Sequence, residues 1–199
     1  MQRDSMFDGR KIVLASLSPR RRELLALTGL SFQVDAGNYE EKMTSHLPPR
    51  ALARRLSRGK AVAVARKYAN ALIIAADTFI VYREEFLGKP HTAKEAVRML
   101  RILNGRTHSV ITGFTILDTA TGKMTSRSVE TRVYFRKLSS REILAYVRSK
   151  EPLDKAGGYA IQGLGSLLIR SIEGDYFNVI GLPLAAVAEA LKDFGVFIL

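Results

Sequence analysis

Short apolar runs alternate with segments of helical periodicity in the first part of this chain. Residues 11–16 and 72–76 are apolar runs that end in polar residues, so they predict two buried strands, the second ending at Asp77. Between them, apolar spacing and capping residues predict helices over residues 19–28 and 50–68, with a short strand separating the two helices. The order strand, helix, strand, helix, strand is typical of an α/β protein.

Capping signals and β-rich runs predict the elements of the remaining chain. Thr92 with Glu95 and Ser139 with Glu142 have the spacing of capping boxes, which start helices. Further elements are strands at 107–117 and 129–135 joined as a hairpin around residues 118–122, a strand at 167–172, and a helix from Pro183 to just before Gly195. We therefore expect a mixed, twisted sheet with flanking helices.

The composition is that of a folded domain, with 47% hydrophobic and 25% charged residues over 199 positions. We expect a single domain over residues 1–199, because no linker rich in Gly, Pro or Ser divides the chain. The absence of cysteine excludes disulfides, cysteine zinc sites and thiol nucleophiles. No stretch reaches the roughly 18 apolar residues of a membrane span and no signal peptide is evident, so we expect a cytoplasmic protein without membrane contact.

Positive charge is concentrated near the start of the chain. The formal net charge is +12, and residues 1–70 hold 14 Lys plus Arg against 6 acids, leaving 17 against 13 in the remainder. Such an imbalance favours anionic partners, either nucleic acid or phosphate-bearing small molecules. Solubility alone is the alternative explanation.

The segment 16–22 combines good helix capping with an unfavourable charge. Ser18 suits the N-cap and Pro19 the first helical position, yet the arginines at 20–22 occupy a first turn whose dipole disfavours cations. A bound phosphate chain would resolve the conflict by accepting backbone N–H bonds and arginine forks together. In the alternative, the arginines bend away into solvent.

Two acidic positions follow predicted strands. Asp77 stands where a strand end opens onto a ligand crevice, and its carboxylate there suits a divalent cation or a water molecule. Glu40 and Glu41, just after the short strand, supply a second carboxylate. As alternatives, Asp77 starts a turn and the two glutamates are solvated loop acids.

Four lysines stand among loop residues rather than on helix faces, and they are Lys42, Lys60, Lys89 and Lys155. The amides Gln162 and Asn178 lie near glycines and have the groups to read a base edge. Surface solvation is the alternative for each lysine. The histidines His46, His91 and His108 are too far apart for a zinc site or a catalytic triad, and we expect His108 to be an ordinary half-buried strand residue.

Seven segments together carry a family resemblance. They are residues 14–25, 76–78, 88–90, 99–108, 151–157, 158–163 and 178–183. On these motifs the chain resembles the Maf family of nucleotide pyrophosphatases over residues 11–194. The resemblance implies hydrolysis of nucleoside triphosphates to the monophosphate and pyrophosphate with Mg²⁺ or Mn²⁺. It also implies an elongated fold of two lobes around a central cleft, shared with inosine triphosphate pyrophosphatases, and a homodimer.

The resemblance implies roles for individual residues. Asp77 is similar to the family's catalytic base, and Glu40 to the second acid that helps hold the metal. The positions implied in phosphate binding and catalysis are Ser16, Arg20, Arg21, Lys60, Lys89 and Lys155, and those implied in the choice of base are Arg20, Thr78 and Gln162.

The sequences of residues 154–157 and 161–163 resemble those of the family branch that acts on dTTP and UTP, rather than those of the branch that acts on 7-methyl-GTP. Gly158 and Ala160 depart from the common pattern without touching the chemistry. The competing hypothesis is a nucleic-acid-binding or division-regulating module without turnover, because the family is also linked with septum formation. No recognition-helix pattern accompanies the basic charge, so we do not expect nucleic acid as a partner.

Overall fold

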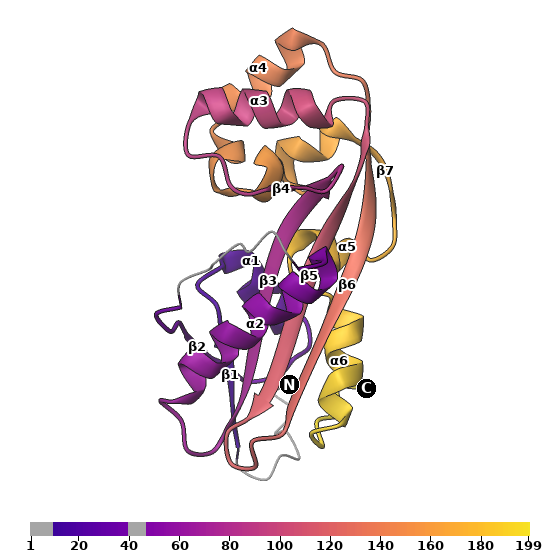
Figure 1. Cartoon of the computed structure of the whole chain (residues 1–199). Helices are drawn as coiled ribbons and strands as arrows, with labels where there is room; N and C mark the ends of the chain where they lie inside the picture. Colours follow the sequence, from indigo (N-terminus) through magenta and orange to yellow (C-terminus); the bar gives the residue numbers. More distant parts are fainter. Residues whose placement is uncertain (1–9, 40–46) are drawn as a thin grey trace. The chain divides into compact units, whose positions relative to one another are not determined.

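The computed structural model describes residues 10–39 and 47–199 (Figure 1). The strands are β1 (Lys11–Ala15), β2 (Gln33–Asp35), β3 (Ala71–Tyr82), β4 (Glu85–Leu87), β5 (Thr107–Asp118), β6 (Met124–Phe135) and β7 (Ile169–Glu173). The α-helices are α1 (Pro19–Ala26), α2 (Pro49–Ala65), α3 (Ala93–Leu103), α4 (Ser140–Arg148), α5 (Tyr176–Ile180) and α6 (Leu184–Lys192). Three short 3-10 helices are η1 (Glu151–Asp154), η2 (Ala156–Gly158) and η3 (Gly163–Leu168).

The strands form one mixed sheet with the order β2-β1-β3-β5-β6-β7, and β4 pairs with β3 beside this path. β1 pairs in parallel with β2 and with β3, whereas β3–β4 and β6–β7 are antiparallel. Parallel neighbours need crossover connections, which α1 and α2 supply. The predicted α/β class with a mixed sheet and flanking helices is confirmed.

The chain divides into two compact units. Unit 1 comprises Met1–Asp77, Thr112–Val129 and Gly181–Leu199, and unit 2 comprises Thr78–Ile111 and Glu130–Ile180. Of the predicted site residues that the structure describes, unit 1 holds Ser16, Arg20, Arg21, Lys60 and Asp77, and unit 2 holds Thr78, Lys89, Lys155 and Gln162. The single domain with a central cleft stays a prediction.

In unit 1, helix α2 lies across the strands of the sheet (Figure 1). Its buried residues follow helical spacing and are Leu52, Ala53, Leu56, Ser57, Ala61 and Val64. Ala61 and Val64 share a core cluster with residues of β1 and β3. Gly113 of β5 permits a close approach, because a Cβ there would lie 2.1 Å from the carbonyl carbon and oxygen of Ala53. The close contact fixes α2, which carries Lys60. Lys60 therefore stands on a helix, contrary to the prediction that it lies off the helix faces.

The core of unit 2 lies under α3 and α4, which lie side by side (Figure 1). α3 buries Ala96, Met99, Leu100 and Leu103, and α4 buries Ile143, Tyr146 and Val147. All of these side chains except Met99 share a core cluster with Val133 and Phe135 of β6 and with Tyr159. Tyr159 thus anchors the loop after α4 in this core.

Three sequence predictions need correction. β3 continues through Asp77 to Tyr82, so Asp77 does not end its strand. The strand predicted at 167–172 begins only at Ile169, because the preceding residues form η3. The capping box at Thr92 is incomplete: its hydroxyl accepts from the Glu95 backbone, but the Glu95 carboxylate accepts from the N–H of His91 instead of closing the box.

No helix in the ranges 10–39 and 47–199 is both long enough and apolar enough to cross a membrane.

Candidate active site

The carboxyl ends of β1 and β2 lie at the same edge of the sheet in unit 1. The parallel register pairs Ala15 with Asp35 of β2, and Leu14 with Ile74 of β3. Because β1 ends first, Ser16 leaves the sheet beside the stretch of β3 that leads to Asp77. Asp77 therefore lies just beyond the end of its neighbouring strand, at the edge where ligands bind in open α/β sheets.

Asp77 is 6% exposed and its Oδ1 atom forms an ion pair with Nζ of Lys60. A buried carboxylate of this kind needs such a partner, because desolvation penalises an isolated charge. The position before Lys60 is glycine, and a Cβ there would lie 2.1 Å from the ring of Tyr39, so a side chain at this position would displace that ring. The Tyr39 ring thus covers the backbone of α2 next to the ion pair. The structure thus brings two of the predicted catalytic residues, Lys60 and Asp77, into direct contact.

The loop between β1 and α1 is organised by the hydroxyl of Ser16. This oxygen accepts the backbone N–H of Ser18 at 3.2 Å and an Nη1–H of Arg21 at 3.3 Å. Ser18 is the N-cap of α1 and Pro19 its first residue, as predicted. The structure thereby brings two predicted phosphate-binding residues into contact, Ser16 and Arg21.

Arg21 does not bend away into solvent. Its Nε–H donates to the carbonyl of Gly181 at 2.8 Å, which ties the first turn of α1 to the segment before α6. Arg20 is half-buried and Arg22 is exposed. The three neighbouring arginines thus have three different surroundings, and the solvent alternative describes only Arg22.

A hollow of about 500 Å³ opens beside this loop. Its lining residues are Ser16, Leu17, Ser18, Pro19, Arg22, Glu23, Ala26 and Val34. Arg22 is the cation in the lining of this hollow, and it was not among the predicted site residues. The available signal was its place in the first helical turn, where its charge opposes the helix dipole.

In unit 2, a backbone hydrogen bond joins two predicted lysine loops. The N–H of Gly157 donates to the carbonyl of Gly88 at 2.8 Å, so the turn that carries Lys89 lies against the loop that carries Lys155. Lys89 is exposed, and Lys155 forms an ion pair with Asp154. Gln162 is exposed, while Thr78 directly follows Asp77 on β3.

Two polar residues noted in the sequence belong to the core. Asn178 is fully buried, and its amide donates to the carbonyl of Val110 at 3.1 Å and to Thr131 Oγ1 at 2.9 Å, so it is not placed to read a base. His108 is fully rather than half buried. Its Nε2 lies 2.6 Å from the hydroxyl of Tyr159, and burial lowers the pKa of His108 to about 3.

A metal site would depend on Asp77. In the described part of the chain no group of three or more His, Cys, Asp or Glu side chains is arranged to hold a metal ion. Glu40, the predicted second acid, lies outside the described residues, as do Glu41, Lys42 and His46. One carboxylate fits Mg²⁺, which commonly takes one or two carboxylates and completes its shell with substrate phosphates and water.

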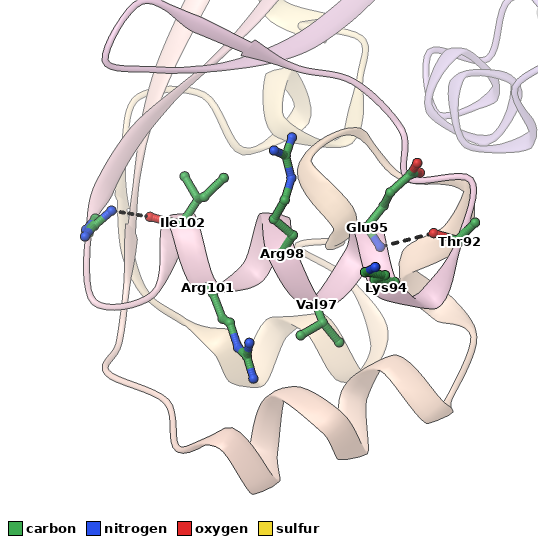
Figure 2. Close-up of a pocket in the computed structure, with 8 residues that line it drawn as sticks. Thr92, Lys94, Glu95, Val97, Arg98, Arg101 and Ile102 are labelled. Atoms are coloured by element: carbon green, nitrogen blue, oxygen red, sulfur yellow. Dashed lines mark hydrogen bonds between the residues drawn. The ribbon is translucent and has the colours of Figure 1, made fainter.

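A second basic hollow, of about 860 Å³, lies on α3 in unit 2. Figure 2 shows Lys94, Arg98 and Arg101 extending from this helix, and Arg106 also lines the hollow. Glu95 is the only carboxylate among the lining residues, and it accepts the His91 N–H at 2.6 Å. This hollow therefore offers cations for an anion but no carboxylate placed like Asp77 beside a lysine.

Comparison with known proteins gives matches over nearly the whole chain. A family model described as "Maf-like protein" matches residues 11–194. A dTTP/UTP pyrophosphatase of Moorella thermoacetica is 50% identical over 186 residues, covering 94% of this chain and 96% of that protein. A protein of the same name from Methanosarcina mazei is 47% identical over 188 residues, covering 94% of this chain and 95% of that protein. Among solved structures, the Staphylococcus aureus Ham1 protein matches 63% of this chain and 72% of its own with a TM-score of 0.46 and 12% identity.

Proposed function

Because the chain belongs to the Maf family, we propose that it is a dTTP/UTP pyrophosphatase, a hydrolase acting on acid anhydrides. It converts the triphosphate into the nucleoside monophosphate and pyrophosphate. The observation that carries this proposal is the match to relatives of that name over 94% of this chain. The ion pair of Lys60 and Asp77 at the carboxyl edge of the sheet supports the same chemistry.

In the proposed reaction, Asp77 takes a proton from a water molecule that attacks the α-phosphorus. The new bond joins the water oxygen to this phosphorus, and the bond to the bridging oxygen breaks, so that pyrophosphate leaves. Lys60 orients the Asp77 carboxylate through their ion pair. A positioned general base of this kind contributes about 10² to 10⁴ in rate.

The substrate carries about four negative charges, which cations and hydrogen-bond donors must balance. We assign this role to Ser16, Arg20 and Arg21 in unit 1 and to Lys89 and Lys155 in unit 2. Arg20, Thr78 and Gln162 are assigned to the choice of base. Exposure of Gln162 and half-burial of Arg20 support their access to a ligand.

Asp77, together with Glu40, would hold a divalent cation, Mg²⁺ or Mn²⁺. When bound there, such an ion neutralises charge on the phosphates. The burial of Asp77 and its place at the sheet edge support this assignment.

We further propose that the protein works as a homodimer in the cytoplasm, as the family resemblance implies. A division-regulating or nucleic-acid-binding role has no observation in the described residues that favours it over hydrolysis.

The test is pyrophosphate release from a panel of nucleoside triphosphates in the presence of Mg²⁺ and of Mn²⁺. We expect turnover of dTTP and UTP, with the monophosphate as the second product. Release of inorganic phosphate with a diphosphate product would contradict the proposed bond cleavage. A folded protein that binds nucleic acid in a salt-dependent way but releases no pyrophosphate from any triphosphate would favour the competing module.

A further inference from the structure

The loop of residues 151–165 in unit 2 carries two of the residues assigned above to the substrate, Lys155 and Gln162. It contains η1, η2 and the beginning of η3, without a strand or an α-helix to fix it. The side chain of Gln162 is exposed, and within the described part of the chain it makes no hydrogen bond that would hold its amide. The place from which this side chain extends is therefore set by the backbone of the loop.

The carboxylate of Glu151 closes this loop on itself. Its Oε1 atom accepts the N–H of Gly165 at 2.9 Å, and its Oε2 atom accepts the N–H of Leu164 at 3.1 Å. Glu151, the first residue of the loop, thus binds the backbone of Leu164 and Gly165 at its end. Hydrogen bonds to an ionised carboxylate are stronger than those between neutral groups, so the closure is firm.

Tyr146 of α4 ties the closed loop to the helix. Its hydroxyl donates to Glu151 Oε1 at 2.9 Å and accepts the N–H of Ala160 at 3.2 Å. Tyr146 is 5% exposed, and this burial raises its pKa well above the usual range, so the phenol keeps its proton. Gln162 therefore lies between two tied points, Ala160 on one side and Leu164 on the other.

Two glycines show how closely the loop is packed on these side chains. A Cβ on Gly165 would lie 2.2 Å from the carbonyl oxygen of Ala160 and 2.7 Å from the Tyr146 hydroxyl. A Cβ on Gly163 would lie 2.8 Å from Oε2 of Glu151, and the φ angle of Gly163 is +66°. Neither position accommodates a side chain without displacing Tyr146 or Glu151. These two residues, with their bonds to Ala160, Leu164 and Gly165, form the clamp of this loop.

We propose that Tyr146 and Glu151 are positioning residues that set the base preference by fixing Gln162. This inference rests on the proposed function. Uracil and thymine present an acceptor at the position where cytosine presents an amino donor. A fixed backbone limits the positions from which the Gln162 amide reaches these edges, whereas on a loose loop the amide can adapt to either. Neither Tyr146 nor Glu151 needs to touch the substrate.

The test compares Tyr146→Phe with Tyr134→Phe. Tyr134 makes the same kind of bond, from its hydroxyl to Glu173 at 2.7 Å, but between β6 and β7. For Tyr146→Phe we expect kcat/KM for UTP to fall about tenfold or more, mainly through KM, because a displaced binding group can cost up to about 10²-fold. The ratio of kcat/KM for UTP to that for CTP should fall about fivefold or more. Tyr134→Phe should leave both quantities within about twofold of the wild type.

A second variant and a second readout complete the test. Glu151→Gln retains the shape of the side chain but loses the charge, and should shift the UTP to CTP ratio in the same direction. Amide hydrogen exchange at Leu164 and Gly165 should accelerate about tenfold or more in both variants. Faster exchange with an unchanged ratio would overturn the proposal and leave a purely structural clamp. Unchanged exchange in both variants would overturn the clamp itself.

An error in the proposed function would give a different experimental result from an error in the role of the loop. If the wild-type protein released no pyrophosphate from UTP or dTTP, the assignment of the reaction would be wrong, and the base preference would fall with it. Turnover by the wild type with a low preference for UTP over CTP would instead contradict only the role assigned to Gln162 and the loop that carries it.

Discussion

Single side chains in this protein often bind backbone groups that lie far away in the sequence. Arg21 donates to the carbonyl of Gly181, Asn178 donates to that of Val110, and Arg10 donates to that of Phe194 at 2.7 Å. Each bond joins elements that neither local propensity nor spacing relates. At the residue scale, therefore, the function of a polar side chain depends on which distant carbonyl it meets.

Replacing Arg21 by lysine tests its double contact. A lysine ammonium cannot reproduce the guanidinium fork that reaches Ser16 and Gly181 together. We expect KM for UTP to rise about threefold or more and the free energy of unfolding to fall by about 1 kcal/mol. Steady-state kinetics and urea unfolding measure the two effects. Arg127→Lys, which alters an exposed pair with Asp193, is the control. An unchanged KM in Arg21→Lys would contradict the assigned role.

His108 makes stability depend on pH. Burial lowers its pKa from 6.5 to about 3, so between these values the unfolded chain binds a proton here and the folded protein does not. Stability therefore falls as the pH decreases from 6.5 toward 3, by up to about 1.4 kcal/mol per pH unit from this group. His108→Gln does not titrate, and its slope between about pH 6 and pH 4.5 should be smaller by about 1 kcal/mol per unit.

Urea unfolding at several pH values measures this slope. His91→Gln is the matched control, because His91 is exposed and the variant should retain the wild-type slope. Equal slopes for the wild type and His108→Gln would show that His108 is not the group responsible.

At the element scale, α2 and β5 approach each other so closely that a side chain at Gly113 would block the contact. A Cβ on Gly113 would lie 2.1 Å from backbone atoms of Ala53, which cannot move without shifting the helix. We expect Gly113→Ala to lower the free energy of unfolding by about 1–3 kcal/mol, the usual cost of overpacking. Thermal or urea unfolding checks this value. Gly88→Ala, where a Cβ would meet nothing within 4 Å, should change stability little.

The elements themselves were largely predictable from local patterns. The box of Ser139 and Glu142 forms in full, because all its atoms lie within one helical turn. The predicted end of β3 was wrong. The apolar run stops at Ala76, but pairing with β4 extends the strand to Tyr82. The contact of Lys60 with Asp77 was not predictable from spacing, because it depends on how α2 packs on the sheet. Asp77 was selected because it follows an apolar run and Lys60 because it stands beside a glycine, whereas their catalytic roles came from the family resemblance.

Across the whole molecule, the positive charge exceeds what a folded domain requires for solubility. The chain has 31 Lys plus Arg against 19 Asp plus Glu. An excess of this size creates a field that draws a triphosphate toward the protein before any specific contact forms. We therefore expect the many cations to contribute to substrate capture as well as to binding.

Salt should reveal this contribution. When the ionic strength rises from about 50 to about 500 mM, we expect kcat/KM for UTP to fall about threefold or more, because the Debye length shortens. The value of kcat at saturating UTP serves as the internal control and should change less, since capture no longer limits the rate. A kcat/KM that is independent of salt would contradict the role of the overall field.

The most direct test of the central claim is pyrophosphate release from UTP by Asp77→Asn. We expect the rate to fall about 10³-fold or more, while nucleotide binding by the folded variant stays close to that of the wild type. Asp118→Asn is the matched control, because Asp118 is also buried and also paired, with Arg10, but lies at the β5–β6 turn. Its rate should remain within about threefold of the wild type. Wild-type release by Asp77→Asn would contradict the account.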